Sequence, residues 1–564
     1  MSTSKTNHEQ PTPRHDGPNT FPNDYFFGTL VRSAYRDDLI AIRDITFGYE
    51  ATYQQFLTDV LYVRNLMRNR MPQQQLEATH TGEGISVGLI GPGGYEFVVG
   101  FFALMAFGAV IVPLAPGISS KEALHLVQTA KISSIVTPSA SLKVANEISE
   151  LISRSTAQYP MLLDIGQYLM QPPLPVDEFI VSSGAYSDPN RPGYIIFTSG
   201  TSGPPKGCVM RRGAIYDVAV TFSHLYNIRG KDTTLHTLPV HHATGIHISL
   251  LPFLVSGACI EFRSGPFRPE ELWDRIREST LHYFSGVPTM YSRLMDFYET
   301  SIVGNPNHIV SEYVTGLRKM RALVCGSAAL PRSLQQKWTD LRQGRPILTR
   351  YGGTEFGVVF WTPPSDPSID SASVGRKFPG VEVKMNHSGE GGLLVKSALG
   401  YSHYIGDSAA TAASFDVDGY FATGDIAHKS HDEYFIDGRL SVDILKSGGY
   451  KISALDIERE ITGLSYVSDA AVVGVEDAEY GQRVAAVISL RQEVRQSLTI
   501  GELRDSLRSV LTGYKLPTVL RIVSRVPRNA THKVNKRELV KRMFPAEGHP
   551  DIQIWRSARA RPRL

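Results

Sequence analysis

Residues 194–207 read YIIFTSGTSGPPKG, an apolar run that changes abruptly to hydroxyls and glycines and then reaches Lys206. The apolar run, Tyr194 to Phe197, predicts a buried strand, and the residues after it predict a loop. Because glycine tolerates backbone angles that other residues avoid, consecutive N–H groups of such a loop can turn toward one centre and form a nest for phosphate oxygens. The hydroxyls add donors and Lys206 adds a positive charge, so the stretch predicts a loop that binds a polyphosphate.

The expected ligands of the phosphates lie along this loop. They are Thr198, Ser199, Gly200, Thr201, Ser202, Gly203 and Lys206. A P-loop would instead require G-x-x-x-x-G-K-[ST] between a strand and a helix. Here Gly207 follows the lysine and residues 208–210 predict a second short strand, so the P-loop interpretation fails on residues and on context. A surface turn without a ligand is the alternative that this stretch alone leaves open.

Length and composition indicate a multidomain globular protein. The 564 residues exceed one ordinary core, and such a length suggests roughly two to four domains. Apolar residues make up 42% and charged residues 20%, and the formal charge of +3 is small, so no broad basic surface for nucleic acid is expected. Cys208, Cys259 and Cys325 are far apart and lack metal-ligand spacing, which indicates a reducing compartment. We expect the cytoplasm.

One long uncharged stretch and the two termini bear on location. Residues 97–115 carry no charge, but Gly100, Gly108 and Pro113 interrupt them. We therefore expect a buried helix that turns directly into a buried strand, and no membrane span. Residues 1–24 are polar, lack the apolar core of a secretory signal and are expected to be a disordered tail. Residues 546–564 form a basic tail whose last three, Pro-Arg-Leu, loosely resemble a peroxisomal signal.

The order of elements predicts the fold class. From residue 84 strands are expected at 85–90, 110–113 and 133–137, with helices at 95–107 and 120–130 between them. Such a series forms a parallel sheet covered by helices. A compact α+β pattern follows the segment 438–451. We therefore expect an α/β protein with a large N-terminal domain of layered sheets at residues 25–438 and a small, mobile C-terminal α+β domain at residues 439–545.

Two further motifs carry side chains suited to a nucleotide and its metal. Residues 351–357 read YGGTEFG, in which the carboxylate of Glu355 stands beside a hydroxyl in a glycine-bounded loop. This pair suits Mg²⁺, a hard cation that binds few protein oxygens and keeps phosphate and water as its other ligands. Residues 419–427 read GYFATGDIA and place Asp425 after a tight turn, where a carboxylate can accept hydrogen bonds from both ribose hydroxyls.

These motifs, together with LPVHHATGIH at 238–247 and GSAAL at 326–330, resemble those of the adenylate-forming superfamily. That superfamily includes acyl-CoA synthetases, luciferases and peptide-synthetase adenylation domains, and the resemblance covers residues 95–539. It implies that Thr198 and Glu355 hold Mg²⁺, Thr354 contacts the α-phosphate, Tyr351 stacks near the base, Gly326 and Ser327 line the adenine and the acyl chain, Asp425 and Arg439 hold the ribose and its phosphate, and His242 lies by the acyl pocket.

In the C-terminal part the resemblance implies a mobile catalytic lysine. Residues 527–539 read PRNATHKVNKREL, in which Lys533 matches the lysine of the superfamily, although His532 stands where a glycine is usual. Lys536 is the alternative. A hinge at Asp443 or a neighbour would withdraw the lysine after the first half of the reaction. The residues then presented for thioester formation would be Gly448, Gly449 and Tyr450.

Within the superfamily the chain is most similar to the malonyl-CoA synthetase group, also called acyl-CoA synthetase family member 3. The phrases GVPTMYSRLM, GSAALP and YGQRVAAV carry this resemblance. It implies an ATP-dependent carboxylic acid:CoA ligase that forms an acyl adenylate, releases pyrophosphate and AMP, and uses ATP, Mg²⁺ and coenzyme A with malonate or another short or medium acid. A free carboxylate on the acid needs a cation, and Arg293 and Arg321 are the candidates.

Two other functions stay open at this point. A free-standing adenylation enzyme would load the acyl group onto the thiol of a carrier protein, since the chain contains no evident carrier domain of its own. A non-catalytic nucleotide-binding protein is suggested by His532, because a side chain with a Cβ restricts the turn before Lys533.

Overall fold

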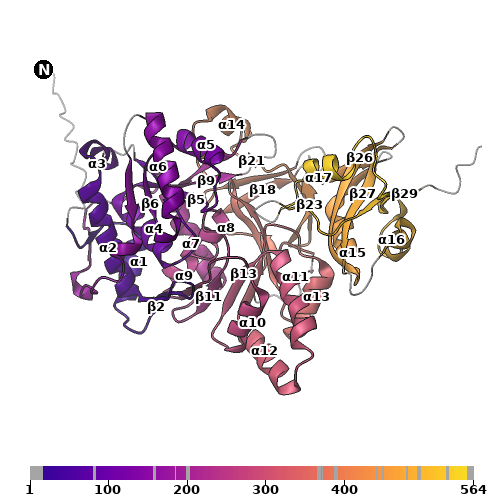
Figure 1. Cartoon of the computed structure of the whole chain (residues 1–564), viewed down its shortest axis with the longest axis horizontal. Coiled ribbons are helices and arrows are strands. Elements are labelled where there is room, and N and C mark those ends of the chain that lie inside the picture. Colours follow the sequence, from indigo (N-terminus) through magenta and orange to yellow (C-terminus); the bar gives the residue numbers. More distant parts are fainter. Residues whose placement is uncertain are drawn as a thin grey trace, which may run out of the picture.

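Two large sheets with covering helices form the N-terminal part of the molecule, and a further sheet forms the C-terminal part (Figure 1). This is the layered α/β class that the sequence predicts. The computed structural model describes residues 17–80, 84–156, 160–184, 186–198, 204–364, 370, 372–385, 392–439, 443–447, 450–477, 480–491, 497–528 and 533–555.

The first sheet has seven strands in the order β20-β10-β9-β5-β4-β6-β7. Strands β4 to β7 and β9 run parallel, as expected from βαβ units, and β10 turns back antiparallel to β9. The strands are β4 (Ser86–Ile90), β5 (Val110–Leu114), β6 (Ile132–Thr137), β7 (Met161–Asp164), β9 (Pro192–Thr198), β10 (Lys206–Arg211) and β20 (His403–Tyr404). The helices of this part are α4 (Tyr95–Phe107), α5 (Ser120–Ala130) and α6 (Leu142–Thr156).

The uncharged stretch of residues 97–115 forms the end of α4 and the strand β5, as predicted. Every residue of α4 is buried, and so is every residue of β5. The helix ends where Gly108 adopts a left-handed backbone angle, φ 89°, which a side chain would oppose. No helix among the described residues is long and apolar enough to cross a membrane.

The second sheet has nine strands in the order β17-β16-β15-β14-β13-β11-β12-β2-β3. Its central strands, from β15 to β2, are parallel. The strands are β2 (Ile40–Asp44), β3 (Tyr49–Thr52), β11 (Thr233–His236), β12 (Cys259–Phe262), β13 (Tyr283–Gly286), β14 (Ala322–Cys325), β15 (Leu348–Gly353), β16 (Gly357–Trp361) and β17 (Arg376–Lys377). The remaining helices of the N-terminal part are α1 (Tyr25–Ala34), α2 (Tyr53–Arg70), α3 (Gln73–His80), α7 (Arg212–Leu225), α8 (Ala243–His247), α9 (Leu251–Val255), α10 (Pro269–Arg277), α11 (Pro288–Phe297), α12 (Asn307–Lys319), α13 (Arg332–Leu341) and α14 (Ser408–Ala413).

Smaller sheets complete the N-terminal part. They are formed by β1 (Thr20–Phe21) with β8 (Ile180–Val181), by β18 (Val381–Met385) with β19 (Leu393–Ser397) and β21 (Phe421–Ala422), and by β22 (Asp425–Ser430) with β23 (Glu433–Arg439). The last of these, the β22–β23 hairpin, ends directly before the C-terminal part begins.

The C-terminal part, orange to yellow at the right of Figure 1, has its own sheet and its own apolar clusters. Its elements are β24 (Ile444–Ser447), β25 (Tyr450–Ser453), α15 (Ala454–Thr462), β26 (Val467–Asp477), β27 (Gly481–Leu490), α16 (Ile500–Leu507), β28 (Val519–Ile522), α17 (Lys536–Met543) and β29 (Ile552–Ile554). Arg491 Nη1 lies 2.5 Å from the Asp296 carboxylate of α11, so an ion pair joins the two parts. The domain boundary at residue 439 stays a prediction.

Helices α10 and α12 pack closely because Gly316 has no side chain. A Cβ on Gly316 would lie 1.9 Å from the carbonyl oxygen of Ile276 in α10. We expect Gly316→Ala to lower the free energy of unfolding by about 1–3 kcal/mol, since overpacking outweighs the helix propensity of alanine. Urea unfolding measures this change.

Gly304 provides the matched control for Gly316. A Cβ on Gly304 would meet nothing within 4 Å, so Gly304→Ala should change the free energy of unfolding by less than about 0.5 kcal/mol. Equal effects of the two substitutions would contradict the packing explanation.

Candidate active site

The carboxyl ends of four neighbouring parallel strands gather the predicted acyl and adenine residues. In the second sheet β11 pairs with β13, β13 with β14, and β14 with β15, and Cys325 stands in register with both Gly286 and Thr349. Residues that follow these strands therefore lie at one edge of the sheet. They are His242 after β11, Gly326 and Ser327 after β14, and Tyr351 in β15.

The predicted phosphate loop joins β9 to β10. Thr198 and Lys206 are paired across the hairpin, and the Thr198 hydroxyl donates to the Lys206 carbonyl at 3.4 Å. The Lys206 ammonium lies 3.9 Å from Asp407 and 5.0 Å from the centre of the Tyr404 ring, and it remains exposed. The other predicted loop ligands, Ser199, Gly200, Thr201, Ser202 and Gly203, lie outside the described residues.

Asp425 joins two of the predicted nucleotide residues. One of its oxygens accepts from the Tyr351 hydroxyl at 2.5 Å, and the other accepts from Arg439 Nε at 2.8 Å. Asp425 and Arg439 stand opposite each other in the β22–β23 hairpin. Burial, with the Asp425 charge, holds the pKa of Tyr351 well above its usual value. Burial alone would lower the pKa of Arg439, but the Asp425 carboxylate raises it.

Glu355 lies in the turn between β15 and β16 and faces the phosphate hairpin. Its Oε1 accepts from the Tyr404 hydroxyl at 3.3 Å, and β20, which carries Tyr404, pairs with β10. Thr354 precedes it in the same turn. Within the described part of the chain no three His, Cys, Asp or Glu side chains cluster as metal ligands. The donors present, one carboxylate and hydroxyls, fit Mg²⁺ completed by phosphate oxygens and water.

Lys533 reaches this group of residues from the C-terminal part. Its residue surface is exposed, but its ammonium lies among protein atoms, and this burial together with the charge of Arg439 lowers its pKa. The negative charges of Glu355 and Asp425 oppose this effect and raise the pKa of Lys533. The charge of Lys533 in turn adds to burial in lowering the pKa of His242 to about 4. Side chains from both parts of the molecule therefore converge on one site.

The alternative lysine has a different environment. The Lys536 ammonium lies 2.5 Å from Asp443 Oδ1 and 2.8 Å from Glu458 Oε1, and only 10% of the side chain is exposed. These two carboxylates raise its pKa despite the opposing effect of burial. A lysine that is held in this way cannot also approach a nucleotide, so Lys533 is the better candidate for the mobile lysine.

Arg350, which the sequence interpretation missed, lies against Gly326. A Cβ on Gly326 would approach the Arg350 side chain to 3.0 Å. Arg350 is 9% exposed, and its buried Nε has no hydrogen-bond partner among the described residues. Burial lowers its pKa. The nearby Tyr226 hydroxyl is also buried without a hydrogen-bond partner in the described structure. An arginine within the apolar run ILTRY was the available signal.

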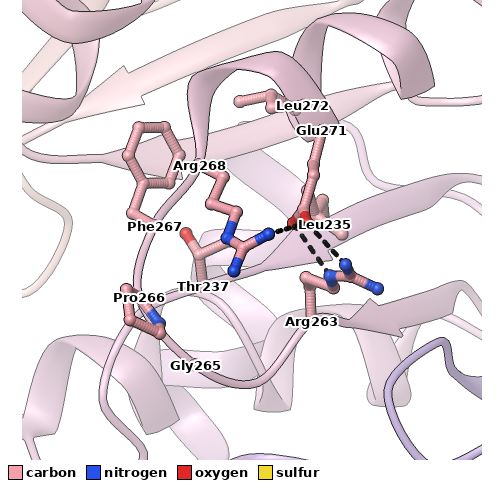
Figure 2. Close-up of a pocket in the computed structure, with 9 residues that line it drawn as sticks. All are labelled: Leu235, Thr237, Arg263, Gly265, Pro266, Phe267, Arg268, Glu271 and Leu272. Carbon is pink, nitrogen blue, oxygen red and sulfur yellow. Dashed lines mark hydrogen bonds and ion pairs between the residues drawn. The ribbon is translucent and has the colours of Figure 1, made fainter.

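The two arginines predicted to bind a second carboxylate have other contacts. Arg321 immediately precedes β14, at the opposite end of that strand from Gly326, and pairs with Asp232. Arg293 lies over the Phe267 ring at 5.3 Å. Figure 2 shows that Phe267 lines a small pocket beside β11, in which the charges of Arg263 and Arg268 are both directed to Glu271. Its lining contains none of the predicted site residues.

The residues predicted to face the active site during thioester formation are described only in part. Tyr450 is 53% exposed, and its ring stacks on that of Tyr514 at 4.3 Å within the C-terminal part. Gly448 and Gly449 lie outside the described residues.

Family models match both parts of the chain. One described as "AMP-binding enzyme" matches residues 32–401, and one described as "AMP-binding enzyme C-terminal domain" matches residues 456–533. The mouse protein named malonate–CoA ligase ACSF3, mitochondrial, is 33% identical over 485 residues, 80% of each chain. The malonate–CoA ligase of Arabidopsis thaliana is 31% identical over 534 residues, 89% of this chain and 86% of the relative.

Solved structures share the fold. ATP-bound MatB from Rhodopseudomonas palustris superposes with a TM-score of 0.75 at 22% identity, covering 91% of this chain and 98% of MatB. A malonyl-CoA ligase with methylmalonyl-CoA and AMP bound is 26% identical, with a TM-score of 0.57 and coverage of 88% and 97%. The likeness to MatB is a likeness of fold alone.

Two buried histidines, His236 and His247, and two half-buried ones, His241 and His242, make stability depend on pH. Burial lowers the pKa values of His236, His241, His242 and His247 from 6.5 to about 4. Between pH 4 and pH 6.5 the unfolded chain binds more protons at these histidines than the folded chain does. The free energy of unfolding is therefore highest above pH 6.5 and decreases as the pH falls toward 4. We expect acidification from pH 7.5 to 5.5 to lower the free energy of unfolding by roughly 5 kcal/mol through these four groups.

Thermal and urea unfolding at the two pH values measure this dependence. His241→Gln should reduce the loss on acidification by about 1.4 kcal/mol, because one proton fewer is taken up on unfolding. His308→Gln, at an exposed position, is the control and should leave the pH dependence unchanged. The same pH dependence in His241→Gln and the wild type would contradict a buried, neutral His241.

Proposed function

This chain belongs to the AMP-binding enzyme family, and from that premise we propose that its acid substrate is malonate or a closely similar dicarboxylate. It is an acid–thiol ligase that activates a carboxylic acid with ATP and transfers the acyl group to coenzyme A. The observation that carries the proposed substrate is the buried, unpaired Arg350 beside Gly326.

In the first half-reaction an acid carboxylate oxygen attacks the α-phosphorus of ATP. A bond forms between that oxygen and the phosphorus, and the bond from phosphorus to the bridging oxygen breaks, so pyrophosphate leaves with the electron pair. Negative charge moves across the reacting atoms, and a fixed cation stabilises it. We assign this role to Lys533, and the action of the charges of Arg439, Glu355 and Asp425 on its ammonium supports the assignment.

The nucleotide would be held by groups that are already oriented. Each Asp425 oxygen accepts one protein hydrogen bond, and a carboxylate oxygen can accept two, so capacity remains for ribose hydroxyls. Tyr351, stacked with Phe356 and Phe360, offers a fixed ring for the base. Gly326 permits close approach of a flat group to the backbone.

Glu355 and Thr198 would hold Mg²⁺, and Thr354 would contact the α-phosphate. When bound, the metal supplies positive charge that neutralises the phosphates. Lys206 and the β9–β10 loop would bind the leaving pyrophosphate.

In the second half-reaction the thiol sulfur of coenzyme A attacks the acyl carbonyl carbon. A carbon–sulfur bond forms, the thiol proton is lost to solvent, and AMP leaves with the electrons of the acyl–oxygen bond. Lys533 must first withdraw to open this path. We propose that the C-terminal part turns near Asp443 and presents the segment that ends at Tyr450.

Arg350 supports an acid with a second carboxylate. A buried guanidinium without a partner is unfavourable unless a ligand supplies one. A carboxylate accepts two parallel hydrogen bonds from arginine, and the free Tyr226 hydroxyl could donate a third. The relatives whose names specify malonate are consistent with this substrate. Arg321 already pairs with Asp232, and Arg293 is exposed and lies over the Phe267 ring, so we rank both below Arg350.

The acceptor of the acyl group is coenzyme A, and the proposed compartment is the cytoplasm. Loading of a carrier-protein thiol, the alternative left open by the sequence, is not favoured by the relatives, which are named CoA ligases. All three cysteines are free and buried, which supports a reducing environment such as the cytoplasm. The mouse relative is named mitochondrial, and the terminal Pro-Arg-Leu lies outside the described residues.

Arg350→Met tests the proposed substrate. We expect kcat/KM for malonate to fall about 100-fold or more, because a buried charge pair with the substrate is lost. For butyrate, which lacks the second carboxylate, kcat/KM should stay the same or rise. The thermal midpoint without acid should not fall, since the variant removes an unpaired buried cation.

Arg321→Met is the matched control for Arg350→Met. It removes an arginine that pairs with Asp232 at the other end of β14, so stability should fall while the ratio of malonate to butyrate activity stays constant. An unchanged ratio in Arg350→Met would contradict the dicarboxylate proposal.

Lys533→Ala tests the role of the mobile lysine. Malonate-dependent exchange of pyrophosphate into ATP should fall about 10²- to 10³-fold, while thioester formation from supplied acyl adenylate is largely retained. Lys541→Ala, at an exposed position in α17, should leave both reactions unchanged. Equal losses of both half-reactions in Lys533→Ala would exclude the assigned role.

A further inference from the structure

A buried ion-pair cluster ties the helix that follows Lys533 to the predicted hinge. Lys536 is the first residue of α17 and lies three residues after Lys533. Its ammonium contacts Asp443 at 2.5 Å and Glu458 of α15 at 2.8 Å. The exposed fractions of the Lys536 and Asp443 side chains are 10% and 14%. The contacts are therefore largely shielded from solvent.

Asp443 also contacts the last strand of the N-terminal part. Its Oδ2 accepts from the backbone N–H of Arg439 at 3.0 Å, and its own N–H donates to the Arg439 carbonyl at 2.7 Å. Gly438 packs against it, since a Cβ there would lie 2.7 Å from the Asp443 Cβ. Gly438 has φ 132°, which a side chain would oppose. The turn is thus closely packed in one arrangement.

Arg439 connects this turn to the nucleotide residues, because its Nε donates to Asp425. A continuous set of polar contacts therefore runs from Asp425 through Arg439 and Asp443 to Lys536. Lys536, the last residue of this set, is separated from Lys533 by two residues of the chain. The charge of Asp425 also acts on the Lys533 ammonium. The set of contacts therefore begins at a residue that influences Lys533 and ends three residues from it in the chain.

We propose that Lys536 is a positioning residue that fixes Lys533 for acyl-adenylate formation. Stability alone does not account for the cluster, since apolar residues commonly replace buried ion pairs without loss. The contact between Lys536 and Asp443 instead specifies one orientation of α17 relative to the hinge. The inference rests on the acyl-adenylate chemistry proposed above and assigns a role to a residue that touches no substrate.

Lys536→Met tests this role, since methionine keeps most of the side-chain volume and removes the charge. We expect kcat for acid-dependent pyrophosphate exchange to fall about 100-fold, as for a catalytic group displaced by about 1 Å. KM for ATP should change little. Thioester formation from supplied acyl adenylate should be largely retained, because Lys533 is withdrawn in that step.

Glu458→Gln is the matched control. It removes the other carboxylate near Lys536 but keeps a side-chain oxygen for the Val472 N–H, which Glu458 Oε1 accepts at 2.7 Å. The contact of Lys536 with Asp443 remains, so pyrophosphate exchange should be largely retained. Equal losses in Glu458→Gln and Lys536→Met, or equal losses of both half-reactions in Lys536→Met, would show a merely structural role and overturn the proposal.

A double-mutant cycle checks that Lys536 acts through Asp443. If the two residues form one path, Lys536→Met combined with Asp443→Asn should lower exchange no further than the more damaging single substitution. Multiplying losses would contradict a shared path and overturn the proposal.

A measurement without acid separates this inference from the proposed function. The probe is 2′,3′-dialdehyde AMP, which reacts with lysines near a bound ribose, and mass spectrometry reports labelling of Lys533. Labelling in the wild type and its loss in Lys536→Met would support the positioning role even if no acid gave exchange. Equal labelling of Lys533 in both proteins, or no labelling in the wild type, would overturn it.

Discussion

The carboxylate of Asp425 is the contact on which the rest of the site depends. It accepts from Tyr351 of the large sheet and from Arg439 of the last hairpin, so it joins the base platform to the strand that leads into the C-terminal part. Because it is mostly buried, its charge acts strongly on these neighbours. The same carboxylate acts on Lys533, which arrives from the other side of the hinge. One anion thus sets the positions of groups from both parts of the molecule.

Burial of charge separates two kinds of side chain in this protein. Lys536 is buried between two carboxylates, so its charge is satisfied within the protein and it orients the chain around it. Arg350 is 9% exposed and its buried Nε has no hydrogen-bond partner among the described residues, and this is why we propose that it binds a ligand. The four histidines with lowered pKa values have a third outcome, because burial keeps them neutral down to about pH 4. Each outcome follows from the cost of an uncompensated charge in a low-dielectric interior.

Local pattern was a good guide to elements whose environment is written in their own residues. The helix and strand that contain the uncharged stretch of residues 97–115 were expected because such residues must be buried on every side. The helices at 95–107 and 120–130 have the expected bounds. Arg350 was missed because its neighbours in the sequence indicate only a buried strand. The residues that surround its side chain, such as Gly326 and Tyr226, come from elsewhere in the chain.

By itself the sequence determined the α/β class, the order of strands and helices in the first sheet, and the chemistry of each motif, because periodicity and residue type are local properties. Only the tertiary structure decided which side chains meet. It brought the Lys533 ammonium within the electrostatic influence of Asp425 and Glu355, paired Lys536 with Asp443, and left the Nε of Arg350 buried without a partner among the described residues. Such contacts join residues far apart in the chain, so they depend on how the sheets pack and on where the C-terminal part lies.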